Sequence, residues 1–283
     1  MSRIDDAIEL ASIDDSLQGE LEHEILEIGQ KLRDLALPTT CPYKDVAKNS
    51  AFLTIRWNGF QEENTQEATR VEVRTLFHAY VSYLEKSFKL RERFYNYWWC
   101  VDDHYVKHDK MNPMEFVLQA DGDYVFSLLY SEVGIHRFTV GEETPELEVE
   151  VVPVLEGDYS IENHDYDTIR LDVFEICGPG GGSVNVSPSG IRATHLPIGI
   201  VSVADDKNQL YNRKIALQIL AGRLYMHEQN ALSNPAIIRE YDLKKKKISD
   251  KRLKKTYEYS GEIHEVLPQI FGETLEQRID SLT

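Results

Sequence analysis

The sequence predicts an α+β fold built from several small modules. Amphipathic helical patterns cover residues 14–36, 66–88 and 211–229, alternating strand patterns lie between them, and strands and helices do not follow a regular βαβ order. The length of 283 residues suggests about two domains, and the apolar fraction of 42% is adequate for globular cores.

The first predicted helix covers residues 14–36. The first 38 residues carry ten acids and three bases, so the face opposite the apolar stripe is acidic. Two arrangements remain open: a helical hairpin with residues 2–12, or docking on a protein partner. The stripe consists of Leu17, Leu21, Ile25, Ile28, Leu32 and Leu35.

The central part of the chain is predicted to be rich in strands. After a boundary at Pro38–Pro42, Ala51–Trp57 is a predicted strand and Gln66–Phe88 a helix. The aromatic residues of 94–108 adjoin acids rather than bases, which favours packing on a sheet over stacking on nucleic-acid bases. Further predicted strands are Tyr124–Tyr130, Leu147–Val151 with three glutamates on its solvent side, Ile169–Val173, and a hairpin over Ile191–Val203.

Composition limits the classes of function. The net charge of −17 argues against nonspecific attraction to nucleic acid. No stretch is long and apolar enough for a membrane span, and the N-terminus lacks a secretory or transit pattern, so we expect a cytoplasmic protein. Cys41, Cys100 and Cys177 are far apart and are interpreted as free thiols. No metal site and no cofactor are expected; we interpret His104 and His108 as a surface or core pair.

One segment reverses the charge balance. Residues 239–255 hold nine Lys or Arg and three acids. Such a run is either a solvated loop or a contact to phosphate groups.

A glycine-rich segment, Gly178–Ser183, is the sharpest local feature. It lacks the Gly-Lys-Ser/Thr of a phosphate-binding P-loop, and the residues after it do not form a helical pattern as a dinucleotide fingerprint requires. By itself it predicts a mobile loop.

The surroundings of this loop are more informative. Residues 168–185 (TIRLDVFEICGPGGGSVN), residues 190–201 (GIRATHLPIGIV) and residues 212–217 (NRKIAL) together resemble the catalytic domain of class I peptide-chain release factors. In that family a strand ends in Ser-Gly-Ala-Gly-Gly-Gln-His-Val-Asn. Gly180 and Gly181 match the two glycines, Asn185 matches the asparagine, and Gly182 occupies the position of the glutamine.

The resemblance is looser elsewhere, over about residues 50–283. Residues 52–56, 67–68, 122–124 and 134–137 are similar to the family's codon-reading domain. The family's loop that discriminates stop codons carries Pro-x-Thr or Ser-Pro-Phe, and residues 138–148 contain neither tripeptide. The implied modules are a shortened helical N-terminal domain (1–45), a codon-recognition-type domain (46–160), a glycine-loop domain (161–232) and a C-terminal segment that packs on the second module (233–283).

The resemblance implies a factor that binds the ribosomal A site and contacts rRNA and peptidyl-tRNA. Gly180, Gly181 and the backbone N–H of Gly182 would face the ester, with weak or absent hydrolysis and little stop-codon specificity. A second hypothesis is a repurposed relative that binds RNA or a protein without catalysis. Candidate RNA contacts are Asn185, Arg192, Arg213, Lys244, Lys245, Lys246, Lys247, Lys251, Arg252, Lys254 and Lys255.

Overall fold

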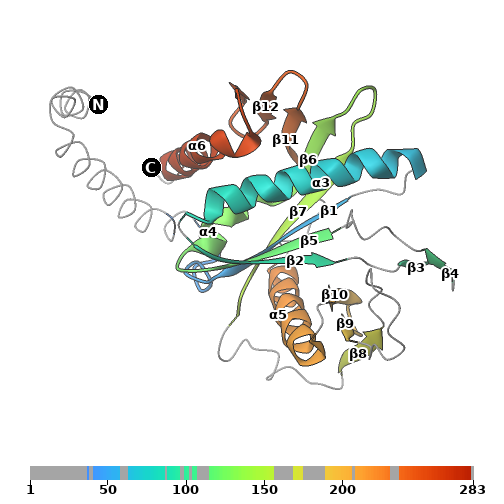
Figure 1. Cartoon of the computed structure of the whole chain (residues 1–283). Coiled ribbons are helices and arrows are strands. Elements are labelled where there is room, and N and C mark those ends of the chain that lie inside the picture. Colours follow the sequence, from blue (N-terminus) through green and yellow to red (C-terminus); the bar gives the residue numbers. More distant parts are fainter. Residues whose placement is uncertain are drawn as a thin grey trace, which may run out of the picture.

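The computed structural model describes residues 37, 41–57, 63–86, 88–95, 99–101, 104–106, 115–155, 168–174, 189–205, 208–229 and 236–281. The acidic helix predicted over 14–36 and the glycine loop lie outside these residues. Helices and sheets are both prominent, and the predicted α+β class is confirmed (Figure 1).

An eight-stranded sheet forms the centre of the molecule. Its strand order is β13-β12-β11-β6-β7-β1-β5-β2, and all neighbours are antiparallel except β11 and β6, which are parallel. The three C-terminal strands therefore extend a sheet that the middle of the chain begins. The strands are β1 (Ala51–Trp57), β2 (Lys89–Tyr95), β5 (Glu115–Asp121), β6 (Gly134–Thr139), β7 (Glu146–Pro153), β11 (Ile237–Asp242), β12 (Lys247–Asp250) and β13 (Lys255–Glu258).

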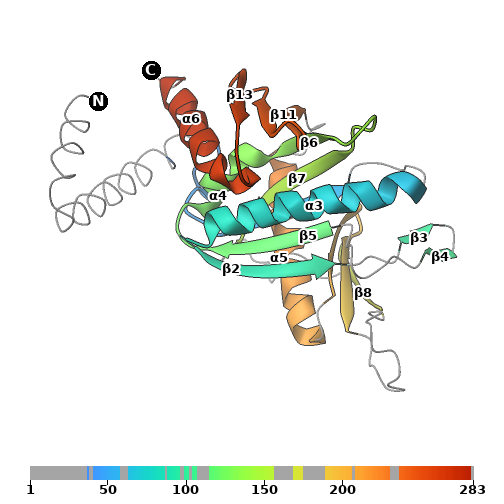
Figure 2. The ribbon, with the colours of Figure 1, turned by 45° about the horizontal axis from the view of Figure 1, so that its top comes forward.

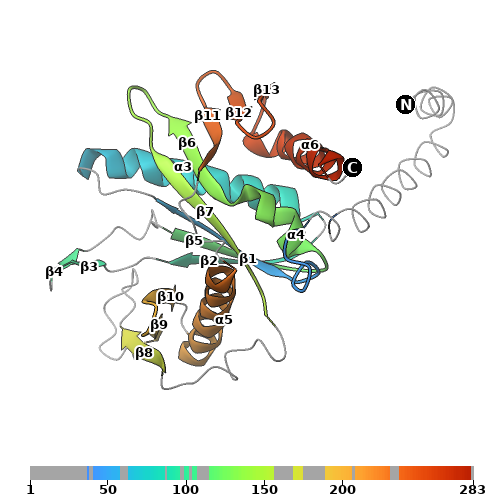
Figure 3. The same ribbon diagram turned by 180° about the vertical axis from the view of Figure 1, so that it is seen from behind.

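Helices cover both faces of this large sheet. Helices α3 (Glu63–Leu84) and α6 (Leu267–Asp280) lie on one face, and α5 (Gln209–Glu228) lies on the other (Figures 1 and 3). The Tyr83 ring of α3 stacks on Phe271 of α6 with 4.7 Å between the ring centroids, which joins the two helices. The predicted helix is present as α3, and its buried stripe includes Val73, Leu76, Phe77, Tyr80 and Leu84.

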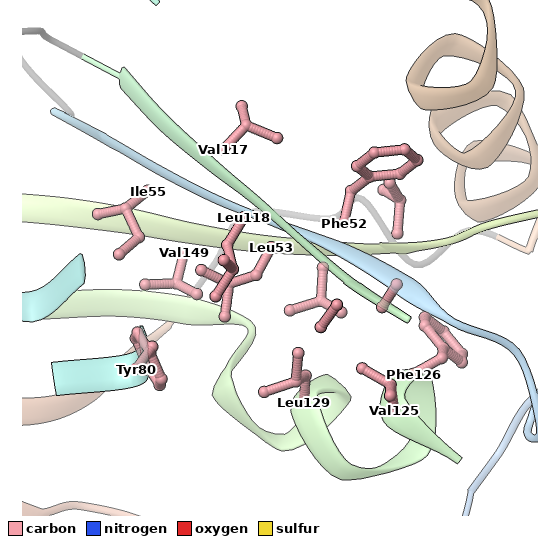
Figure 4. Close-up of a cluster of buried hydrophobic side chains, with 14 of the residues drawn as sticks. Phe52, Leu53, Ile55, Tyr80, Val117, Leu118, Val125, Phe126, Leu129 and Val149 are labelled. Carbon is pink, nitrogen blue, oxygen red and sulfur yellow. The ribbon is translucent and has the colours of Figure 1, made fainter. Parts of the chain in front are cut away.

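Side chains of β1 and β5 alternate between the two faces of the large sheet and contribute to the apolar core on each face. Leu53 and Leu118 point toward Tyr80 of α3, whereas Phe52 and Val117 point to the opposite side of the sheet (Figure 4). All of them are buried, so β1 and β5 are covered on both faces of the sheet.

A smaller three-stranded sheet packs beside α5. Its order is β10-β9-β8, all antiparallel, with β8 (Ile169–Phe174), β9 (Gly190–His195) and β10 (Ile200–Ala204). We call this sheet together with α5 the glycine-loop unit. Figure 2 shows it on the far side of the large sheet from α3. A separate ribbon pairs β3 (Trp99–Val101) with β4 (His104–Val106).

One predicted strand is wrong. Residues 124–130 begin with Tyr124 in the left-handed region at φ 63° and continue as helix α4 (Val125–Leu129) and a 3-10 turn η1 (Tyr130–Glu132). All five residues of α4 are buried, so its apolar run has no polar face that would distinguish a helix from a strand.

A buried ion cluster joins the C-terminal strands to the rest of the sheet. Arg239 of β11 is fully buried and donates to Glu132 of η1 at 2.6 and 2.9 Å and to Asp250 of β12 at 3.0 and 3.1 Å. Tyr80 of α3 donates to the same Glu132 at 2.7 Å. Burial alone would raise the pKa of Glu132, but Arg239 and Arg252 outweigh it and hold that pKa well below its ordinary value.

His136 of β6 is buried against this cluster in its neutral form. The carbonyl of Glu132 can only accept, so Nε2 donates to it at 3.1 Å and Nδ1 accepts from the Tyr241 hydroxyl at 2.8 Å. Burial, reinforced by the positive charge of Arg239, lowers the pKa of His136 to about 3.

None of the helices in the described part of the chain is long and apolar enough to cross a membrane.

His136 should make stability depend on pH. Because its folded pKa of about 3 lies below the ordinary value of 6.5, the unfolded chain binds a proton that the folded chain refuses between these values. The free energy of unfolding should therefore fall as the pH drops through this window, by up to about 1.4 kcal/mol per pH unit from this group. Urea unfolding at pH 6.5, 5.5 and 4.5 measures the slope.

The comparison variants are His136→Gln and His78→Gln, the latter on the exposed side of α3. His136→Gln should flatten the slope between pH 6.5 and 5.5, and His78→Gln should leave it unchanged. Equal slopes in all three proteins would contradict the assignment.

Candidate functional site at the base of the glycine loop

The two ends of the glycine loop are held side by side. Phe174, the last residue of β8, lies opposite Gly190, the first residue of β9. A Cβ on Gly190 would stand 2.5 Å from the Phe174 ring, so glycine is what lets the ring cover this point. Residues 175–188, with Gly180, Gly181, Gly182 and Asn185, lie outside the described residues and leave from this pair.

Helix α5 fixes the same end of the small sheet. The buried Asn212 donates from Nδ2 to the carbonyl of Ser189 at 2.7 Å, directly before β9. Asn208 caps the helix by accepting from the N–H of Tyr211 at 3.1 Å. Farther along, the Ser202 hydroxyl of β10 donates to Ala216 of α5 at 2.6 Å. The loop therefore starts from a base that a helix and a sheet hold together.

Two predicted RNA contacts flank this base. Arg192 on β9 and Arg213 in the second turn of α5 are both exposed. In the register of the sheet Arg192 lies opposite Asp172, whose carboxylate pairs with Arg170 at 3.0 Å. Neither Arg192 nor Arg213 forms an ion pair with another described residue.

The predicted basic run forms two tight hairpins, and the acids on them compensate much of its charge. Asp242 and Asp250 each precede a four-residue turn and accept backbone N–H groups of that turn, which places Lys246 and Lys254 in the left-handed region. Four lysines form exposed ion pairs: Lys245 with Asp242 at 3.0 Å, Lys247 with Glu258 at 2.7 Å, Lys251 with Glu240 at 2.5 Å and Lys255 with Glu273 at 2.8 Å.

Other members of the run also have internal contacts. The Lys246 ammonium donates to the Ser260 carbonyl, and Lys244 is on the exposed turn. Arg252 is largely buried: its guanidinium donates to Asp250 at 2.5 Å and to the Ser131 carbonyl, and lies 3.5 Å from Glu132. We therefore assign Arg252 to the buried ion cluster and leave it out of the proposed RNA-binding surface.

The turn between β6 and β7 is short and acidic. Val140 and Glu143 exchange both backbone hydrogen bonds at 3.0 Å, so Gly141 and Glu142 alone form the tip. Gly141, the first of the two tip residues, has φ 64°, as a type II′ hairpin turn requires at that position. Glu142 and Glu143 are exposed, and the Arg137 guanidinium at the base is bound to Glu146 at 2.6 Å.

Sequence patterns missed one contact of the glycine-loop unit. Glu150 was expected on the solvent side of β7, but it is buried and accepts from Arg223 of α5 at 2.6 to 3.2 Å. Burial acts to raise the pKa of Glu150, and the charges of Arg223 and Arg56 outweigh it, so the pKa lies below its ordinary value. The two residues are 73 positions apart, and no local periodicity connects them.

This arrangement matches known proteins. Residues 158–265 match the family model of the RF-1 domain. The chain is 31% identical to peptide chain release factor 2 of Arthrobacter sp. over 241 residues, covering 80% of this chain and 60% of that protein. It is 32% identical to peptide chain release factor 1 of Exiguobacterium sibiricum over 242 residues, with the same coverage. The fold superposes on RF2 of Thermus thermophilus with a TM-score of 0.63 and 23% identity, covering 93% of this chain and 77% of that one.

The fold is release-factor-like, and the match to the RF-1 domain spans the whole glycine-loop unit. The chain belongs to the class I peptide-chain release factor family. A further match, 38% identical over 135 residues, is to release factor 2 of Renibacterium salmoninarum and spans 35% of that protein. The matched regions thus span 35% to 60% of the length of these relatives.

The Asn212 contact is a test of the loop base. Asn212→Ala removes the buried donor that ties α5 to Ser189, and we expect it to lower the free energy of unfolding by about 1–3 kcal/mol. Gln218→Ala, on a partly exposed face of the same helix, should change it by no more than about 0.5 kcal/mol. Urea denaturation gives both values, and equal effects would show that the contact does not hold the base.

Proposed function

We propose that this chain binds the ribosomal A site as a specialised release, rescue or occupancy factor. In this proposal it hydrolyses peptidyl-tRNA weakly or not at all and has little dependence on a stop codon. Membership of the release factor family supports the ribosome as the partner. The observation that supports codon independence is the closed, acidic β6–β7 turn, which stands where the family resemblance places the codon-discriminating loop.

The chemistry follows from the residue at position 182. In the family the backbone N–H at the glutamine stabilises the oxyanion that forms when water attacks the ester, and the side chain helps place that water. Such a preorganised donor contributes roughly 2.7–4 kcal/mol. Gly182 retains the N–H and lacks the side-chain amide, and three consecutive glycines raise the entropy lost when the loop is ordered. A slow reaction is therefore expected.

The base of the loop suits a role in positioning. Phe174, Gly190 and Asn212 hold the two loop ends together, and this favours retention of the loop's placement after loss of the catalytic side chain. Arg192 and Arg213 beside it are the proposed contacts to rRNA phosphates, because their charges are exposed. The compensated lysines of residues 244–255 are proposed to contribute less, since exposed pairs already occupy four of them.

The first test is peptide release from ribosome complexes that carry peptidyl-tRNA. The wild-type chain should release peptide at least about a hundredfold more slowly than an ordinary release factor. Gly182→Gln should raise the rate, because it restores the side chain that places water. Ser183→Gln puts the same side chain at the adjacent position and should leave the rate unchanged. Release by the wild-type chain at the rate of an ordinary factor would contradict the proposal.

The second test concerns the codon. The β6–β7 turn offers carboxylates to the message and no hydrogen-bonding tripeptide, so the Kd for ribosomes with UAA or with a sense codon in the A site should agree within about threefold. Replacing both Glu142 and Glu143 by Gln should strengthen binding to both complexes by relieving repulsion from the mRNA phosphates.

The matched control replaces Glu276 by Gln and Asp280 by Asn, which changes the net charge equally on the exposed face of α6. Its affinity should stay near that of the wild type. A preference for UAA of tenfold or more would exclude codon-independent binding.

A further inference from the structure

The second half of α5 is buried on every side. Residues 219–226 are all buried, whereas the first half of the helix exposes Leu210, Arg213 and Lys214. One side of the buried half faces the small sheet, and the other faces β7 of the large sheet (Figure 3). A helix enclosed in this way belongs to both sheets, so its contacts with β7 determine how the glycine-loop unit is oriented.

Shape restricts the separation of α5 from β7. A Cβ on Gly222 would stand 2.8 Å from the Pro153 carbonyl and 2.9 Å from Cβ of Val152. These are backbone and near-backbone atoms that cannot rotate aside. Helix and strand therefore approach as closely as two backbones allow, and glycine is required at this point.

Charged contacts then restrict the orientation of α5 relative to β7. The Arg223 guanidinium donates from Nε and Nη2 to the Glu150 carboxylate and from Nη1 to the Val201 carbonyl of β10 at 2.5 Å. One planar group thus contacts both sheets. Arg56 of β1 holds the same carboxylate at 2.7 Å from the side of the large sheet. A fork of fixed geometry specifies an angle, which a single ammonium group would not do.

A second polar contact lies near the end of the helix. The Tyr225 hydroxyl donates to Asp45 at 2.7 Å, and the Tyr225 ring meets Tyr43 edge-on with 6.4 Å between the centroids. The glycine-loop unit is thus attached through two residues of α5, Arg223 and Tyr225, that lie within one helical turn. Rotation of the unit about one of these contacts would break the other contact.

We propose that Glu150, held between Arg56 and Arg223, is a positioning residue that sets the direction in which the glycine-loop unit extends from the large sheet. The contact is a property of the free chain. Only its consequence, the placement of the loop near an ester, rests on the proposed function.

Distances between spin labels test this on the full chain without ribosomes. Labels attached through a noncanonical amino acid at Glu142 in the β6–β7 turn and at Ile198 in the β9–β10 turn report on one unit each, and both positions are exposed. The wild-type chain should give one narrow distance distribution. Glu150→Gln and Arg223→Lys should broaden or shift it, because the first removes the charge and the second removes the fork.

The control is Glu146→Gln on the same strand, which removes the surface pair with Arg137 and leaves the α5 interface intact. Its distribution should coincide with that of the wild type. Far-UV circular dichroism and urea unfolding establish which variants are folded. If Glu150→Gln does not fold, Arg223→Lys still tests the proposal, because it keeps the positive charge. Folded variants with the wild-type distribution would overturn the proposal. If the variants broaden the distance distribution but the wild-type chain does not bind ribosomes, the positioning role of Glu150 is retained and the proposed function is rejected.

Discussion

The buried guanidinium of Arg239 is the contact on which the large sheet depends. It joins two carboxylates from distant parts of the chain: Glu132 lies 107 positions before Arg239, and Asp250 lies 11 positions after it. Removing one member of such a cluster leaves an uncompensated charge in the core, which typically costs about 3–5 kcal/mol. The cluster thus ties the C-terminal strands to η1, beside the parallel pairing of β11 with β6.

The same chemistry connects the sheet to the glycine-loop unit. Glu150 lies on β7, two strands from β11, and is neutralised by cations from both sides. Several of the protein's arginines are therefore used inside the molecule. Together with the paired lysines of the C-terminal hairpins, this leaves little broad positive surface among the described residues of a chain with net charge −17. Binding to a complex that contains nucleic acid would then depend on a few exposed basic side chains and on the shape of the surface.

Much of the fold was predictable because its elements are periodic. The helix α3, the strand β7 with its alternation as far as Val149, and the hairpin over Ile191–Val203 follow patterns of 3.6 or 2 residues, and the structure has all three. The run in α4 has no such period, since Val125–Leu129 is buried all round, and the strand predicted there was wrong. The family was recognisable from residues 168–185, 190–201 and 212–217, which include the glycine-rich segment and its neighbours in the sequence.

The charged contacts were not predictable from local sequence. Arg239 and Arg252 stand in the same basic run as Lys244 and Lys251, and composition treats the four alike. Burial distinguishes them, and burial depends on acids brought in by other strands. Glu150 follows the alternation of an exposed position, and only the docking of α5 encloses it.

A cryo-EM map of the chain mixed with ribosomes that hold peptidyl-tRNA tests whether the chain binds in the A site. We expect density in the A site, with the glycine loop directed at the peptidyl-tRNA ester and the acidic β6–β7 turn making no hydrogen bond to a codon base. Ribosomes without this chain in the A site, at concentrations that saturate an ordinary release factor, would contradict it.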